Sequence, residues 1–238
     1  MFRMNAVAAG FGLAALYACA STTPAAKLDD SGLSRLSANQ MQPVDDARVD
    51  QGRARDALAK AKATAAESRM KLEVARSDRA VADAQLKRAT AERDLLRKQY
   101  ADKDSIARAE NEIEASQLRA QAGDLRLAYL TRMIAVSDGD QRLAEAHVET
   151  TAAIGEQTKL KAMQEGNVPQ ASSGNQGTID QRAAVAMQRE AEIVSATSKE
   201  RTAAASEYQK WQELDARVRA REQSPTAISP STGPSAPR

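Results

Sequence analysis

Few side chains in this sequence have the chemistry of a catalytic or metal-binding site. His147 is the only histidine, so histidine ligands cannot cluster around a metal. A Ser-His-Asp triad would need a folded cleft, which the long helical patterns described below do not offer. Asp138-Gly139-Asp140 could begin a calcium loop, but no bidentate glutamate closes the series of ligands. The sequence therefore predicts a turn here, with no metal, no cofactor, no small-molecule substrate and no enzymatic activity.

Cys19 is the one residue whose neighbours specify a covalent chemistry. It is the only cysteine, and it follows a short apolar run at 6–16 that is preceded by Arg3. A basic residue followed by an apolar run of this length is typical of a secretory signal. About 12 apolar residues are too few to cross a bilayer of ~30 Å as a helix. We therefore expect a signal peptide over 1–18.

Leu16, Tyr17, Ala18 and Cys19 resemble the lipobox of bacterial lipoproteins. Leu16 and Ala18 match the lipobox, whereas Tyr17 is bulky where a small residue is usual, and the resemblance covers only the N-terminus. It implies signal-peptidase recognition through Leu16 and Ala18, acylation of Cys19 and permanent attachment of the mature chain to a membrane. Ala20 stands where an aspartate favours inner-membrane retention in many Gram-negative bacteria. The resemblance thus implies an outer-membrane lipoprotein that faces the periplasm.

The same residues allow a second processing route. Ala18-Cys19-Ala20 is also an Ala-x-Ala site, at which ordinary signal peptidase would cut before Ser21 and discard the cysteine. The product would be a soluble periplasmic protein with no lipid anchor.

Composition favours long helices over a globular domain. Charged residues make up 28% of the chain, and much of the 42% hydrophobic content is alanine, which buries little apolar area. The 34 basic and 32 acidic residues are mixed along the chain, so no basic face is available for nucleic acid. Beyond the signal, the aromatic residues are Tyr100, Tyr129, Tyr208 and Trp211.

Proline, glycine and cap residues divide the chain into segments. Pro43 is suited to a first helical turn, and no further proline occurs before Pro169. Thr178 and Gln181 have the spacing of a capping box that opens another helix. We expect a signal peptide at 1–18, a lipidated N-terminus and flexible linker at 19–42, a long coiled-coil helix with a turn at 137–140 and a return helix at 43–165, a flexible linker at 166–177, a C-terminal helix at 178–222 and a disordered Pro/Ser-rich tail at 223–238.

An apolar seam with heptad spacing runs along the long helix. It passes through Leu58, Ala65 and Leu72, is interrupted by Arg79 and Arg93, and changes phase around 100–105. A second apolar face opens before the predicted turn, where more than one helix should pack. We take this face as a candidate partner-contact patch, formed by Leu118, Leu125, Tyr129, Met133 and Val136.

These patterns predict an all-α fold, a long helical hairpin or coiled coil with a flexible N-terminal linker and a disordered C-terminal tail. The outgoing helix at 44–136 would span roughly 140 Å at 1.5 Å per residue, and both ends of the chain would lie near one membrane. A parallel homo-oligomer of continuous helices is the alternative, against which the broken seam and the predicted turn argue.

Three functions agree with this reading. The first is a non-enzymatic, lipid-anchored spacer, scaffold or adaptor for a periplasmic or outer-membrane complex. It would bind the membrane through Cys19, and a protein partner or a second copy through its coiled coil. The second is a soluble periplasmic chaperone-like helical protein, cleaved before Ser21. The third is an accessory of an enzyme or of the cell wall, although no wall-binding segment is visible.

Overall fold

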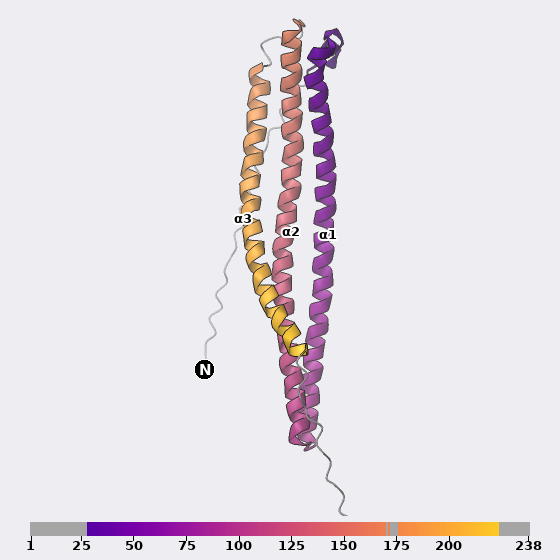
Figure 1. Cartoon of the computed structure of the whole chain (residues 1–238), viewed down its shortest axis with the longest axis vertical. Coiled ribbons are helices and arrows are strands. Elements are labelled where there is room, and N and C mark those ends of the chain that lie inside the picture. The colour runs from indigo at the N-terminus through magenta and orange to yellow at the C-terminus, as the bar shows by residue number, and fades with distance from the viewer. Residues whose placement is uncertain (1–27, 170, 172–175, 224–238) are drawn as a thin grey trace, which may run out of the picture.

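The computed structural model describes residues 28–169, 171 and 176–223, and all regular structure in this part of the chain is helical. Helices α1 and α3 both pack along α2, and toward its end α3 crosses α2, so that Trp211 and Val218 line a cleft together with Val81 of α1 (Figure 1). The predicted all-α class and the helical hairpin are confirmed. The predicted signal peptide at 1–18 and most of the tail at 223–238 lie outside the described residues. The elements are the 3-10 helix η1 (Asp30–Arg35) and the helices α1 (Ala38–Lys98), α2 (Lys103–Glu165) and α3 (Gln176–Gln223).

Alanine dominates the interface between α1 and α2, as the heptad pattern predicted. Small side chains let two helices approach closely, which compensates for the little apolar area that each contributes. Leu72 and Ala75 of α1 form a buried cluster with Leu130 of α2, and Ile134 packs against it. The buried residues of this seam are Ala54, Ala65, Leu72, Ala75, Ala82 and Ala89 on α1, and Ala109, Ile113, Ala120 and Leu130 on α2.

The chain reverses direction at 99–102, between α1 and α2, and not at 137–140. Residues 137–140 are helical and lie in the middle of α2. Ser137 and Gly139 are buried there, because Ser137 faces α1 and Gly139 faces α3. The predicted turn at 137–140 is therefore wrong: a helix packed on two sides needs small residues where its neighbours approach most closely. The change of phase in the heptad seam at 100–105 correctly indicated the position of the turn.

The turn at 99–102 is short and is closed by backbone and side-chain caps. Tyr100 has φ 52°, in the left-handed region, and its N–H donates to the Arg97 carbonyl at 3.3 Å. The Ala101 N–H donates to the Leu96 carbonyl at 3.0 Å, which completes a left-handed C-terminal cap of α1. Asp102 then caps α2 by accepting a hydrogen bond from the Ser105 N–H at 2.8 Å.

The other end of the rod holds a small core that the sequence did not predict. Val44 of α1 and Met163 of α2 are almost fully buried, together with Leu33 of η1 and with Val168. Leu28 joins a neighbouring cluster with Leu160 and Ile179. The predicted flexible linkers at 19–42 and 166–177 are thus corrected at 28–42 and 166–169, which are folded against the helix ends because they supply the apolar cover that those ends lack.

Two helix starts differ from their predicted positions. Helix α1 begins at Ala38, five residues before Pro43, because the Ser37 N–H and hydroxyl both donate to the Gln40 side chain, at 2.9 and 3.0 Å, and this cap opens the helix earlier. Pro43 lies inside the helix. Helix α3 begins at Gln176, so Thr178 is an interior residue and not a cap.

The rod is shorter than the predicted 140 Å. At 1.5 Å per residue, the 63 residues of α2 span about 95 Å. Helix α3 ends before it reaches the turn at 99–102 (Figure 1). Its Glu222 pairs with Arg119, whereas Leu28 at the other end of the described chain bonds to Glu156, roughly 55 Å away along α2. The two ends of the described chain therefore lie far apart along the rod. The lipidated end and the C-terminal tail, which were predicted to lie near one membrane, are outside the described residues.

Candidate functional site

Helix α3 of the same chain occupies the predicted partner-contact patch. Tyr129 stacks on Trp211 with ring centroids 5.9 Å apart, and Tyr208 lies 5.0 Å from the Tyr129 ring. Val136 is buried, and Leu118, Leu125, Met133 and Tyr129 are half-buried. The second apolar face therefore exists, and as predicted a second helix packs there, but it is not a free surface for a partner. Tyr208 and Trp211 of α3 thus pack against α2, as expected for aromatic residues on long helices that lie side by side.

Ion pairs and hydrogen bonds hold α3 on α2 over its whole length. Buried residues are few along α3, namely Ile179, Ala183, Thr197 and Ala204. Each exposed ion pair contributes about 0–1 kcal/mol, so together they specify register more than they add stability. The paired groups are Gln157 with Asp180, His147 with Glu190, Glu149 with Arg189, Asp140 with Arg201, Arg132 with Glu200, and Arg119 with Glu222.

The residues that could have carried chemistry are paired with residues of neighbouring helices. His147 is half-exposed, and its Nδ1 lies 3.0 Å from Glu190 Oε1. Asp138 pairs with Arg69 of α1, at 2.8 Å, and Asp140 pairs with Arg201 of α3, at 2.5 Å. The two aspartates therefore point toward different neighbouring helices. Within the described residues, no group of three or more histidine, cysteine or acidic side chains is placed to hold a metal ion.

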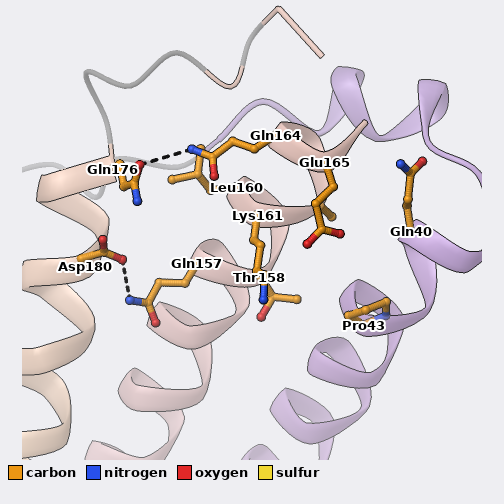
Figure 2. Close-up of a pocket in the computed structure, with 11 residues that line it drawn as sticks. Gln40, Pro43, Gln157, Thr158, Leu160, Lys161, Gln164, Glu165, Gln176 and Asp180 are labelled. Atoms are coloured by element: carbon orange, nitrogen blue, oxygen red, sulfur yellow. Dashed lines mark hydrogen bonds between the residues drawn. The ribbon is translucent and has the colours of Figure 1, made fainter. Parts of the chain in front are cut away.

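A cleft lies at the end of the rod that contains Leu28. It has a volume of about 640 Å³ and is open to solvent between the start of α1, the end of α2 and the start of α3 (Figure 2). Its wall is rich in amides that bond to one another: Gln157 donates to Asp180 at 2.7 Å and Gln164 to Gln176 at 3.3 Å.

A lysine and two acids tie the 3-10 helix to this end of the rod. Lys159 donates to Asp30 at 2.8 Å and to Glu156 at 3.2 Å, and Glu156 also accepts the Leu28 N–H. Burial lowers the pKa of Lys159, but its bonds to the two carboxylates outweigh this effect, so the pKa is raised and the group stays charged. Leu28 and Asp30 are thus held at a fixed point on α2.

The opposite end of the rod exposes an aromatic side chain that sequence analysis did not select. Tyr100 is 94% exposed and Leu95 is 54% exposed, at the two-helix tip that α3 does not cover. A non-glycine residue with positive φ is uncommon and, for a bulky residue, costs free energy. Folding does not repay this cost, because nothing packs on the ring. In the sequence, only the change of heptad phase at 100–105 indicated this turn, because tyrosine is not typical of a left-handed position.

No protein-family model, curated protein or solved structure matches this chain.

The residues of the predicted anchor, Leu16, Ala18 and Cys19, lie outside the described residues. None of the helices in the described part of the chain combines the length and apolarity needed to cross a membrane.

Proposed function

We propose that this protein is a non-catalytic, lipid-anchored envelope protein that acts as a rigid spacer or adaptor. Acylated Cys19 would hold it in the outer membrane, and the rod would face the periplasm. The observation that carries the proposal is the geometry of the two ends: the chain from Cys19 enters the rod at Leu28, and the tip with Tyr100 lies a full helix length away.

The short distance between anchor and rod supports the spacer role. Eight residues separate Cys19 from Leu28, and from Leu28 onward the chain is fastened to α2 by the Glu156 bond and the apolar clusters. The anchor would therefore act on the end of a stiff rod and not on a long tether. The opposite tip would stand about 95 Å from that end.

The tip supports the adaptor role. Tyr100 is held in a costly conformation with its ring in solvent, and Lys98 and Lys103 flank it as exposed cations. Such a residue is expected where a partner protein buries the ring on binding. The adaptor would present this tip, and not the patch at 118–136, to a complex.

The orientation can be tested in liposomes that contain the lipidated protein and an energy acceptor among the lipids. A donor fluorophore is placed on Glu165→Cys, near the proposed membrane end, or on Lys103→Cys at the tip. Both positions are exposed, and about 93 Å of α2 separates them. Strong energy transfer from 165 and none from 103 is the expected result. Equal transfer from both would mean that the rod lies along the membrane, which would reject the spacer.

A further inference from the structure

A second cleft lies where all three long helices meet. Toward its end α3 crosses α2, and its side chains there face α1 as well as α2 (Figure 1). The cleft has a volume of about 360 Å³ and opens to solvent. This size and a position between helices are typical of small-molecule sites, which measure about 300–1,000 Å³. Val81 of α1, Ala122 of α2 and Val218 of α3 contribute to its apolar wall.

Trp211 of α3 gives this cleft an aromatic surface. The indole stacks on Tyr129, with ring centroids 5.9 Å apart and 9° between the ring planes, and Tyr208 lies against it at 5.6 Å. The ring is only half-buried, and the rest of its surface lines the cleft. The face of an aromatic ring is electron-rich, so it attracts the weakly positive C–H groups of a saturated ring. The two tyrosines hold the indole in position before any ligand binds.

Several hydrogen-bonding groups around the indole have bonding capacity to spare. The indole N–H of Trp211 and the side-chain amide of Gln85 have no hydrogen-bond partner among the described residues. Arg126 uses one of its N–H groups, since its Nη1 donates to Asp78 Oδ2 at 2.7 Å. The other oxygen of Asp78 remains available as an acceptor. Free donors and a free acceptor thus lie beside one aromatic surface.

The arginines of the cleft are already paired, so the cleft does not select an anion. Each of the three forms an ion pair with a carboxylate of the same chain, namely Arg79 with Asp124, Arg119 with Glu222 and Arg126 with Asp78. An anionic ligand would have to compete with these carboxylates, whereas a neutral ligand needs only hydrogen bonds. The pairs also hold their side chains in fixed positions, which lowers the entropic cost of binding.

We propose that this cleft binds a neutral saccharide, with one sugar ring packed on Trp211 and its hydroxyl groups bonded to Gln85, Arg126 and Asp78. A hydroxyl group both donates and accepts hydrogen bonds, so it can use the free donors and the free acceptor together. A hydrocarbon chain would leave the same groups without partners, at a cost in free energy. The saccharide would be bound and not converted. In the cell envelope its source would be wall glycan or another glycan, and only this choice of source rests on the proposed function.

The emission of Trp211 tests the proposal, because it is the only tryptophan of the chain. The mature protein, in a detergent without a sugar headgroup, is titrated with chitotriose, which carries the N-acetylated amino sugars of wall glycan, and with maltotriose, which lacks them. Calorimetry on the same samples detects binding that leaves the emission unchanged. Saturable binding of a trisaccharide is the expected result, and the tighter of the two indicates the source.

Two results of these titrations would overturn the proposal. One is that neither trisaccharide binds. The other is that adenosine binds and neither trisaccharide does, which would make the indole a stacking site for flat aromatic ligands. The test does not depend on the anchor, since a soluble mature chain that binds a trisaccharide would reject the anchor and keep the cleft.

Two matched pairs of variants assign the binding to this cleft. Gln85→Ala removes the free amide and should weaken binding about fivefold, as the loss of one hydrogen bond does, whereas Gln42→Ala, at another exposed glutamine of α1, should not. Val81→Phe fills part of the cleft and should prevent binding. Val74→Phe, at a valine of α1 that is 56% exposed against 54% for Val81 and lies outside the cleft, should leave it intact. All four side chains are exposed, so the unfolding midpoints should change little. Equal effects within either pair would place the binding elsewhere and reject the proposal.

Discussion

The position that a Cβ atom would take on Gly123 of α2 lies 2.6 Å from the Cδ atom of Arg79 on α1. Arg79 lies in the seam between α1 and α2, where the heptad pattern marked it as an interruption. Its side chain crosses α2 over the glycine and reaches Asp124, with Nε 2.6 Å from Oδ1. The hydrogen bond to Asp124, followed by that to Asp83, raises the pKa of Arg79, so the buried part of the seam holds a permanent charge. The arginine and the glycine together fix the register of α1 on α2.

Replacing Gly123 tests this fit against an open glycine. Nothing lies within 4 Å of a Cβ on Gly52, which is also inside a helix, so Gly52→Ala should raise the free energy of unfolding by about 0.5–1 kcal/mol. Gly123→Ala should give no such gain or should lower the free energy of unfolding, because Arg79 must move away from the carboxylates of Asp124 and Asp83. Denaturant titrations of both variants give the comparison, and equal gains at the two positions would contradict the fit.

Gly139 has the same role on the other side of α2. A Cβ there would lie 2.7 Å from Thr197 Oγ1 and 3.0 Å from Thr197 Cγ2, and Thr197 is buried. We expect Gly139→Ala to destabilise the protein by about 1–3 kcal/mol, as overpacking does in a closed core. In a Thr197→Ala background the cost should be smaller, since two of the crowding atoms are gone. A double-mutant cycle by thermal unfolding measures the coupling, and additive effects would show that the two residues do not meet.

These two glycines show why the sequence predicted the helices better than their connections. The seam between α1 and α2 followed from heptad spacing, since Ala65 and Leu72 are buried as expected. An Asp-Gly pair is a strong local signal for a turn, but the same lack of a side chain at Gly139 serves close packing against α3, and no local pattern reveals that neighbour. The actual turn has Tyr100 at the position where glycine is usual. The sequence therefore indicated this turn only through the change of phase in the heptad pattern.

The candidate patch shows the same limit. The apolar face at 118–136 was correctly recognised, but its occupant proved to be α3, because pairing between helices depends on contacts that spacing alone does not specify. The core around Met163 was missed since its members come from four short stretches of chain.

Substitution of Tyr100 should separate stability from function. Tyr100→Gly removes the steric cost of a positive φ and should stabilise the protein by about 1 kcal/mol, although it removes an aromatic side chain. Asn167 has the same φ of 52° at the end of α2, and asparagine tolerates this conformation, so Asn167→Gly should change stability less. Thermal unfolding compares the two. A destabilised Tyr100→Gly would mean that the ring contributes to folding and is not kept for a partner.

Asp102 should make the tip sensitive to acid. Hydrogen bonds from the side chain and then from the backbone N–H of Ser105 lower the pKa of Asp102 in the folded protein. Its contribution to stability is therefore present above the unfolded pKa of about 3.9 and is lost as pH falls through the lower, folded pKa. Asp102→Ala should be less stable than the wild type at pH 6, and the difference should shrink toward pH 2. Unfolding midpoints across this range provide the check; a constant difference would show that the carboxylate charge has no part in the cap.

The intact mass of the mature protein, recovered separately from membrane and soluble envelope fractions, tests the central claim most directly. A lipid-anchored rod predicts a membrane-bound species that starts at Cys19 and carries the added mass of its acyl chains. A soluble species that starts at Ser21 would contradict the anchor and would favour the soluble, chaperone-like alternative.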